Sequence, residues 1–273
     1  SVVGQAIVQS PDVDALTFTG SQPTGAALVV DSAKLMRKSQ MEMGGKNPFI
    51  VLADADLDVA VDCVTQGALY STGQRCTASS RIIVEQAIHD RFVAALAERV
   101  SALNVGDALD ASTQIGPVVD ESQLAQNEDY IAIGQSEGAR LVVGGERLSG
   151  PTEGFFQRPA LFADCTNDMR IAREEIFGPV ATVIQVNDYD EALAVANDTD
   201  FGLSAGSATT SLKHATHFKR NAEAGMVMVN LPTAGVDFHV PFGGRKASSF
   251  GPGEQGRYAA EFYTTVKTAY TSA

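Results

Sequence analysis

Residues 49–84 read FIVLADADLDVAVDCVTQGALYSTGQRCTASSRIIV, and this stretch decides the fold class. Its apolar start at 49–52 is typical of a short buried strand. Asp54 or Asp56 then caps a segment whose apolar residues recur at helical spacing, and a second apolar run follows at 81–84. A strand, a helix and another strand in succession predict an α/β fold, with a mostly parallel sheet covered by helices.

The same alternation continues on both sides of this unit. Apolar residues at helical spacing predict a long helix over 88–103. Further strands are expected at 16–19, 141–143, 158–162, 180–186, 203–208 and 226–229. Further helices are expected at 24–36, 189–196, 211–222 and within 106–140, with loops at Gly144-Gly145 and Gly150-Pro151.

The composition excludes several classes of protein. The chain has 273 residues, 44% of them hydrophobic, and a formal charge of −13, which argues against a nucleic-acid partner. No apolar run reaches the roughly 20 residues needed to span a bilayer, and no signal-peptide pattern opens the chain, so no membrane partner is expected. The three cysteines are too few and too scattered for a disulfide scaffold, which predicts a reducing, cytoplasmic environment.

A thiol and a carboxylate in glycine-framed segments are the strongest chemical signal. Cys76 lies in GQRCTA and Glu42 in MEMGGK, and both are expected in loops. A thiol can attack an electrophilic carbonyl and hold it as a thioester, and a carboxylate can activate the water that releases it. Arg75 could favour the thiolate, and the methionines beside Glu42 could raise its pKa. Together the two residues predict covalent catalysis on an aldehyde.

Each of these residues also has an ordinary structural interpretation. Cys76 could be a small buried hydrophobe, the interpretation preferred for Cys63 on its amphipathic helix, whereas Cys165 is expected in a loop without a partner. Glu42 could be an exposed carboxylate. Gly20-Ser21 could be a simple turn between strand and helix, or a helix start whose free N–H groups bind phosphate. Local sequence alone leaves these alternatives open.

Two metal-like patterns fail on their spacing. The run DADLD at 54–58 begins like a calcium loop, but Val59 replaces the required glycine and Thr65 the glutamate. It is predicted to cap a helix instead. His214 and His217 share a helix face without a third ligand, which is more typical of a solvated face than of a metal site. No metal is expected.

Several sequence blocks, in one order along the chain, carry a family resemblance. They are FTGS (18–21), EMGGK (42–46), GQRC (73–76), EEIFGP (174–179) and PFGG (241–244). In this order they resemble the aldehyde dehydrogenase superfamily, from near Gly4 to the C-terminal segment Phe262-Tyr263-Thr264. The resemblance implies the second half of such an enzyme, an aldehyde dehydrogenase-like catalytic domain with a remnant of a Rossmann-like cofactor domain. The implied division is a cofactor-domain remnant at 1–44, a catalytic domain at 45–245, and a C-terminal segment with an oligomerisation strand at 246–273.

The resemblance implies a role for each block. Cys76 is the expected nucleophile and Glu42 the base that activates water, which favours hydrolysis over transfer of the acyl group to coenzyme A. The turn Gly20-Ser21 is expected at the pyrophosphate of NAD or NADP. Glu175 is expected to hold the nicotinamide-side ribose, with Phe177 alongside the nicotinamide. Phe242 is expected to line the aldehyde pocket.

Three nearby polar residues are expected to stay outside the chemistry. Glu174 is a neighbour of Glu175 without the ribose contact. Asn230 is expected to bridge two loops. Lys46 is either a surface charge or a residue that orders the segment around Glu42.

The start of the chain bears on the expected activity. Ser1 is not a methionine, so the chain is compatible with a processed product or a fragment. In the family, the preceding half carries the adenosine-binding strands and an asparagine that helps to stabilise the oxyanion. Losing one oxyanion donor typically costs about 10²–10³ in rate. The chain alone is therefore expected to bind the dinucleotide poorly and to oxidise aldehydes slowly or not at all.

The last block favours one class of substrate. Residues 242–256, FGGRKASSFGPGEQG, depart from the commonest family form, in which glycine and arginine flank the glutamate. With NLPTAGV at 230–236, this variant is similar to bacterial α-ketoglutaric semialdehyde dehydrogenases of sugar-acid degradation. The similarity predicts a semialdehyde that carries a carboxylate.

Two other functions stay open. Cys76 and Glu42 could hydrolyse activated esters without a cofactor, as a thiol esterase does. The chain could also be a non-catalytic truncated or assembly fragment, since residues 261–270, EFYTTVKTAY, are rich in β-formers and suit an intersubunit strand. The expected partners are a small-molecule aldehyde and further copies of the chain, in a homodimer or homotetramer.

Overall fold

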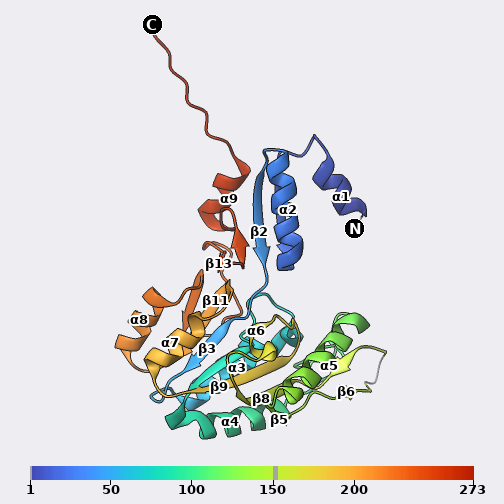
Figure 1. Ribbon diagram of the computed structural model, residues 1–273, viewed down its shortest axis with the longest axis vertical. Helices are drawn as coiled ribbons and strands as arrows, with labels where there is room; N and C mark the ends of the chain where they lie inside the picture. Colours follow the sequence, from blue (N-terminus) through green and yellow to red (C-terminus); the bar gives the residue numbers. More distant parts are fainter. Residues whose placement is uncertain (1, 150–152) are drawn as a thin grey trace.

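The computed structural model describes residues 2–149 and 153–273, and the loop expected at Gly150-Pro151 lies outside the described residues. Figure 1 shows two bodies, one around a large sheet and one around a small sheet that lies near the N-terminus. Among the described residues, no helix is long and apolar enough to cross a membrane.

The large sheet has seven strands in the order β12-β11-β3-β4-β9-β8-β5. All neighbours are parallel except β5 and β8. The strands are β3 (Pro48–Val51), β4 (Arg81–Glu85), β5 (Arg140–Val143), β8 (Ala160–Cys165), β9 (Val180–Val186), β11 (Ser204–Ala208) and β12 (Met226–Val229). The prediction of a mostly parallel sheet is therefore confirmed.

Helices cover both faces of this sheet, so its central strands are buried and read as continuous apolar runs. One face packs on α3 (Leu57–Leu69) and α4 (Gln86–Ser101) around Phe49 and Phe92. The other face packs on α7 (Tyr189–Asn197) and α8 (Leu212–Asn221) at one end, and near α5 (Glu121–Ser136) and α6 (Arg170–Arg173) at the other. Short strands flank it: β6 (Arg147–Leu148), β7 (Phe156–Gln157), β10 (Phe201–Gly202) and β13 (Arg245–Lys246).

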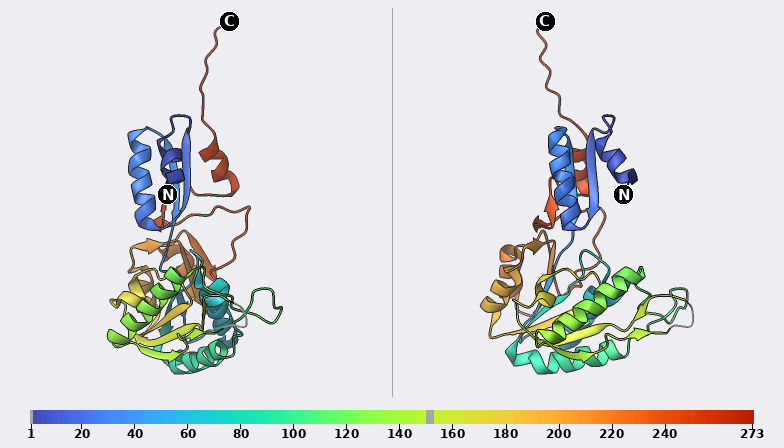
Figure 2. Two further views of the ribbon diagram at one scale, coloured as in Figure 1. Left: turned by 90° about the vertical axis from the view of Figure 1, so that its right-hand side faces the viewer. Right: turned by 45° about the vertical axis from the view of Figure 1, so that its right-hand side comes forward.

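The small sheet joins residues from both ends of the chain. Its order is β1-β2-β14, with β1 (Ala15–Gly20) parallel to β2 (Lys38–Met43), and β14 (Ser249–Phe250) antiparallel to β2. The helices α1 (Val2–Gln9), α2 (Gln22–Lys34) and α9 (Gly256–Tyr263) lie around it (Figures 1 and 2). Beyond α9, residues 264–273 run outward as exposed chain without an assigned strand.

The predicted strands and helices are present, with ends shifted by a few residues. Asp56 caps α3, as predicted, because its side chain accepts hydrogen bonds from the backbone N–H groups of Asp58 and Val59. Three expectations were wrong. Glu42 lies on β2 rather than in a loop, Cys165 is the buried last residue of β8 rather than a loop residue, and 261–263 belong to α9 rather than to an extended segment.

Candidate active site

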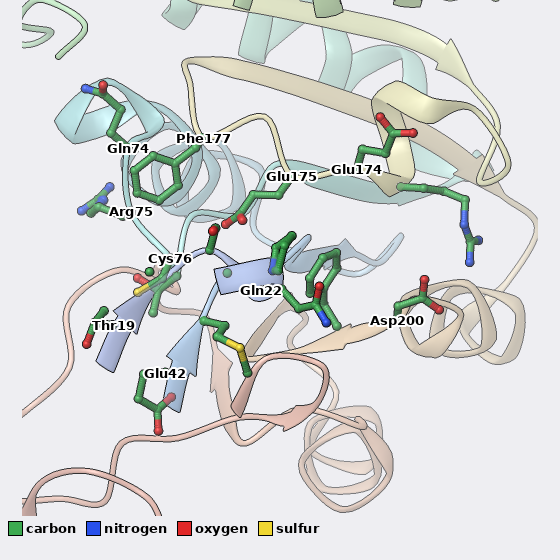
Figure 3. Close-up of a pocket in the computed structure, with 18 of the residues that line it drawn as sticks. Thr19, Gln22, Glu42, Gln74, Arg75, Cys76, Glu174, Glu175, Phe177 and Asp200 are labelled. Carbon is green, nitrogen blue, oxygen red and sulfur yellow. The ribbon is translucent and has the colours of Figure 1, made fainter. Parts of the chain in front are cut away.

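One pocket of about 1200 Å³ opens between the small and the large sheet. Side chains from β1, β2, the loop after α3 and the loop before β9 line it (Figure 3). All of the predicted site residues are among its lining residues: Gly20, Ser21, Glu42, Cys76, Glu175, Phe177 and Phe242. The structure thus brings together five blocks that the sequence separates by up to 222 positions (242 − 20).

The loop that carries Cys76 follows the short 3₁₀ helix η1 (Tyr70–Gly73). Hydrogen bonds from the side chain of Asn47 hold this loop in place. The Asn47 amide donates hydrogen bonds to the carbonyl oxygens of Cys76 at 2.7 Å and Ala78 at 2.9 Å. Its own oxygen accepts the N–H of Ser204 at 3.0 Å. Asn47 is 2% exposed, so one buried amide ties the Cys76 loop to β11 of the large sheet.

The surroundings of Cys76 favour the neutral thiol. Burial raises the pKa of Cys76 above its ordinary value, and the negative charges of Glu175 and Glu42 raise it further. The backbone N–H groups of Thr77 and of Cys76 itself lower it without reversing the shift. The expected influence of Arg75 therefore does not produce a net stabilisation of the thiolate. The Arg75 guanidinium donates to the carbonyl oxygen of Gln66 instead.

Gly73 fixes the approach of the Cys76 loop to the loop around Phe177. It has a φ of +63°, and a Cβ there would collide with the carbonyl oxygen of Gly178. Only glycine meets both conditions without strain, because a side chain disfavours this φ and no space is left for one. The two loops can therefore pack directly against each other.

Replacing Gly73 by alanine should destabilise the fold and displace Cys76. The left-handed backbone alone costs about 1–2 kcal/mol, and the collision with Gly178 adds to it. Urea unfolding measures the loss in stability, and the rate of alkylation of Cys76 reports on the loop. Gly138→Ala is the matched control, because Gly138 has a φ of +94° in open space. Equal losses in the two variants would contradict the role of the close approach.

Glu42 is a buried carboxyl with a high proton affinity. It is 3% exposed, and burial raises its pKa to about 7. A hydrogen bond from Ser249 opposes this rise, and the negative charge of Glu254 adds to it. In Figure 3 the Glu42 carboxylate is directed away from the Cys76 sulfur. At neutral pH the group therefore exchanges a proton readily.

The two neighbouring glutamates of EEIFGP, Glu174 and Glu175, have different hydrogen-bond partners. Glu175 accepts the backbone N–H of Gly45 at 3.0 Å, and its carboxylate occupies the space that a Cβ at Gly44 would need. Burial raises the pKa of Glu175. Glu174 instead bonds Arg170 at 2.9 Å and the Tyr130 hydroxyl at 2.7 Å. Only Glu175 is thus held against the segment that carries Glu42.

Phe177 presents its ring to the pocket from a strained backbone. Its φ is +58°, which is a genuine outlier for a bulky residue, and its side chain is 40% exposed. Such strain persists only where the surrounding structure enforces it, and it is concentrated at functional sites.

The remaining predicted polar residues have clear positions. Lys46 is fully buried, so the surface interpretation was wrong, and burial together with Arg81 lowers its pKa to about 7. Asn230 bridges two segments as predicted, since its amide bonds both the N–H and the carbonyl of Thr209. Within the described parts of the chain, no group of three or more His, Cys, Asp and Glu residues could hold a metal ion.

The turn from β1 to α2 forms the far end of the pocket. Ser21 precedes α2 without capping it through its side chain, and its hydroxyl lies 3.0 Å from that of Thr24. On the opposite side, the backbone of Phe242 exchanges two hydrogen bonds of 2.7 Å with Glu254. This pairing closes the 242–254 loop beside Glu42.

Comparisons with known proteins agree with this geometry. Residues 1–269 match the aldehyde dehydrogenase family. The chain is 44% identical to an α-ketoglutaric semialdehyde dehydrogenase of Bacillus subtilis, over 99% of the chain and 56% of the relative. It is 43% identical to a betaine aldehyde dehydrogenase of Sinorhizobium fredii, over 98% of the chain and 55% of the relative. The chain therefore spans about half the length of the curated relatives it matches.

Solved structures agree as well. An NAD-dependent aldehyde dehydrogenase from Sinorhizobium meliloti superposes with a TM-score of 0.93 at 38% identity, covering 97% of this chain and 52% of that one. The NAD⁺ complex of an aldehyde dehydrogenase from Bacillus cereus gives the same TM-score and identity, covering 97% and 53% of the two chains. By its sequence and by its fold, the chain belongs to the aldehyde dehydrogenase family.

Proposed function

We propose that the chain is the catalytic part of a non-acylating, NAD(P)-dependent aldehyde dehydrogenase. It oxidises an aldehyde to a carboxylic acid through a thioester on Cys76. The observation that carries this proposal is the shared pocket, in which a thiol, a carboxyl with a pKa of about 7 and the Glu175–Phe177 loop meet from three separate segments. The pocket thus contains a nucleophile, a base and a surface for a cofactor.

The residues of this chain support two chemical stages. The Cys76 thiol gives up its proton to solvent, the resulting thiolate adds to the aldehyde carbon, and the backbone N–H of Cys76 can donate to the oxygen that becomes negative. A bound nicotinamide would supply the hydride acceptor that this oxidation needs. In the second stage Glu42 takes a proton from water, the water oxygen adds to the thioester carbonyl, and the sulfur leaves as thiolate.

The lining residues fit a dinucleotide. The pocket runs without interruption from the β1–α2 turn at Gly20 and Ser21 to Cys76. The start of α2 offers backbone N–H groups to phosphate oxygens. Glu175 offers a half-buried carboxylate to ribose hydroxyls, and Phe177 offers an exposed ring to a flat heterocycle. The similar Bacillus cereus enzyme has been solved with NAD⁺. NAD or NADP is therefore the proposed cofactor.

The charge balance of the pocket supports a substrate with a carboxylate. Three arginines line the pocket, and two of them are paired: Arg170 with Glu174 at 2.9 Å, and Arg173 with Asp198 at 3.3 Å. Arg75 has no carboxylate partner in the described part of the chain and bonds a backbone carbonyl instead. Its charge, next to Cys76 in the chain, would attract the free carboxylate of α-ketoglutaric semialdehyde, the substrate named for the Bacillus subtilis relative.

Steady-state oxidation of three aldehydes by the full-length protein that carries this chain tests the proposal. We expect kcat/KM to be highest for α-ketoglutaric semialdehyde, lower for a neutral aliphatic aldehyde, and lowest for betaine aldehyde. Arg75→Gln should reduce kcat/KM for the semialdehyde by about 10- to 100-fold, the usual effect of losing one charged hydrogen bond. It should leave the neutral aldehyde nearly unaffected.

Arg170→Gln is the matched control, since Arg170 is already neutralised by Glu174. Higher efficiency on the neutral aldehyde than on the semialdehyde in the wild type would contradict the substrate class. Equal losses on both substrates in Arg75→Gln would contradict the role of Arg75.

Three features of the whole protein belong to the same proposal. We propose that residues 1–44 are a cofactor-domain remnant, 45–245 the catalytic domain, and 246–273 a C-terminal oligomerisation segment. The protein is a cytoplasmic homo-oligomer, and the exposed side chains of Val266 and Tyr270 in its tail support an assembly role. Cofactor-independent hydrolysis of activated esters is the second candidate activity, because the Cys76 and Glu42 pair is complete without a nucleotide.

A further inference from the structure

The strand β14 brings one hydroxyl group onto the carboxylate of Glu42. In the antiparallel pairing of β14 and β2, Ser249 lies opposite Glu42. Its Oγ lies 2.6 Å from Oε2 of Glu42, although 207 positions separate the two residues in the sequence. The contact belongs to the 242–256 block, of which the proposed function has so far used only Phe242.

The hydrogen bonds around Ser249 determine the direction of this contact. The backbone N–H of Gly244 donates to Ser249 Oγ at 2.6 Å, and an amide nitrogen cannot accept in return. The single proton of the hydroxyl therefore remains available to Glu42. An ionised carboxylate can only accept, so Ser249 donates to Oε2.

The other oxygen of Glu42 has different surroundings. Oε1 is buried and has no hydrogen-bond partner in the described residues. It lies beside Gly243, where a Cβ would be only 3.4 Å away. A buried oxygen without a partner is costly, and either a water molecule or a proton relieves that cost.

We propose that Ser249 is a positioning residue for Glu42. Its hydroxyl donates a hydrogen bond to Oε2 and leaves Oε1 as the oxygen that takes the proton from water. This role rests on the proposed function of Glu42 as the general base. The proton moves from the water oxygen to Oε1, while the remaining hydroxide adds to the thioester carbonyl and the bond to Cys76 Sγ breaks.

The charged groups that face Glu42 make the contribution of Ser249 measurable. Burial and the carboxylate of Glu254 raise the pKa of Glu42, and the hydrogen bond from Ser249 lowers it. Cys76, across the pocket, is coupled to Glu42 by charge. On the other side of β2, the residue of β1 opposite Glu42 is the uncharged Thr19. Removing the Ser249 hydroxyl should therefore raise the pKa of Glu42 above about 7.

Titration of Glu42 by carbon NMR in the 273-residue chain is the first test, with the signal assigned by its loss in Glu42→Gln. Ser249→Ala should raise the pKa of Glu42 by about one unit, the size expected for one hydrogen bond to a charged group. Ser249→Thr retains the hydroxyl and should restore the wild-type value. Ser39→Ala, on the same strand as Glu42, is the control and should leave it unchanged.

The pH profile of kcat in the full-length protein is the second test. Glu42 must be ionised to act, so its higher pKa in Ser249→Ala moves the acid limb of the profile to higher pH, and the plateau at high pH falls because the ionised carboxylate is no longer held in place. A loss of activity at every pH, with an unmoved limb, would show a merely structural role and overturn the proposal.

The two tests separate this inference from the proposed function. Should the NMR shift occur in a protein that oxidises no aldehyde, the contact is correct and the proposed function is wrong. Should the protein oxidise aldehydes while Ser249→Ala leaves both the pKa of Glu42 and the acid limb unchanged, Ser249 has no such role.

Discussion

The Cys76→Ala variant of the full-length protein should lose aldehyde oxidation by at least about 10⁴-fold, because it removes the proposed covalent nucleophile and with it the acyl-enzyme route. It should lose hydrolysis of a chromogenic ester as well, with and without NAD. Cys63 and Cys165 cannot substitute for it. Both are buried, and burial raises the pKa of Cys63 to about 11 and that of Cys165 to about 12, so neither forms a thiolate at neutral pH.

The same assay distinguishes the three functions that the sequence allows. Loss of both activities in Cys76→Ala, with NAD-dependent oxidation in the wild type, supports the dehydrogenase. Ester hydrolysis without any oxidation in the wild type supports the thiol esterase. A wild-type protein that neither oxidises aldehydes nor hydrolyses the ester supports the assembly fragment. Cys63→Ala is the control, because Cys63 lies on the buried face of α3, packs in the core and is outside the pocket.

The fold could be predicted because its main elements are determined locally. Strands β3, β4 and β9 are apolar runs, and α3 and α4 show helical spacing, so short windows of sequence identify them. The strand β2 was missed because KSQMEM has no such run. Its residues Gln40 to Met43 are buried by pairing with β1 and β14, which lie elsewhere in the sequence.

Cys165 is a second example of a position whose structure depends on a neighbouring strand and not on the local sequence. The run Asp164-Cys165-Thr166-Asn167 has the composition of a loop. The structure nevertheless extends β8 to Cys165 through a register irregularity after Phe162, and Asp164 takes a φ of +58° there. A bulge of this kind depends on the neighbouring strand, so local composition does not reveal it.

The residues of the site also fall into two groups, those that the sequence could predict and those that only the structure shows. Cys76, Glu42 and Glu175 could be predicted to lie together because each lies in a recognisable block, and all three line one pocket. Asn47 and Ser249 could not, because their importance lies in contacts that the fold creates: Asn47 with Ser204, and Ser249 with Glu42, are separated by 157 and 207 positions. The position of Asn47 directly after Gly45-Lys46 is the one signal in the sequence, and its burial and its partners are seen only in the structure.

Glu42→Gln should separate the two stages of the reaction. The amide cannot take a proton from water, so steady-state turnover should fall by about 10²–10⁴-fold, the usual contribution of a general base. In the proposed mechanism, thioester formation does not use this base. A burst of reduced cofactor, equal in amount to the enzyme, should therefore remain in a rapid-mixing experiment.

The pH dependence of turnover follows from the raised pKa of Glu42. A carboxyl whose pKa is raised to about 7 is protonated and inactive below that pH, so wild-type turnover should rise as the pH increases through 7. The Glu42→Gln profile should lack this limb. Cys76 should also be alkylated faster in this variant at a given pH. The negative charge of Glu42 contributes to the raised pKa of the thiol, so its removal increases the fraction of thiolate.

Glu174→Gln is the control for Glu42→Gln, because Glu174 lines the same pocket but is neutralised by Arg170. It should retain both the burst and the acid limb. If Glu42→Gln instead loses the burst along with turnover, the carboxylate acts before the thioester forms, as the group that deprotonates Cys76. The absence of hydrolysis in a variant that still accumulates the thioester is the outcome that assigns Glu42 to water.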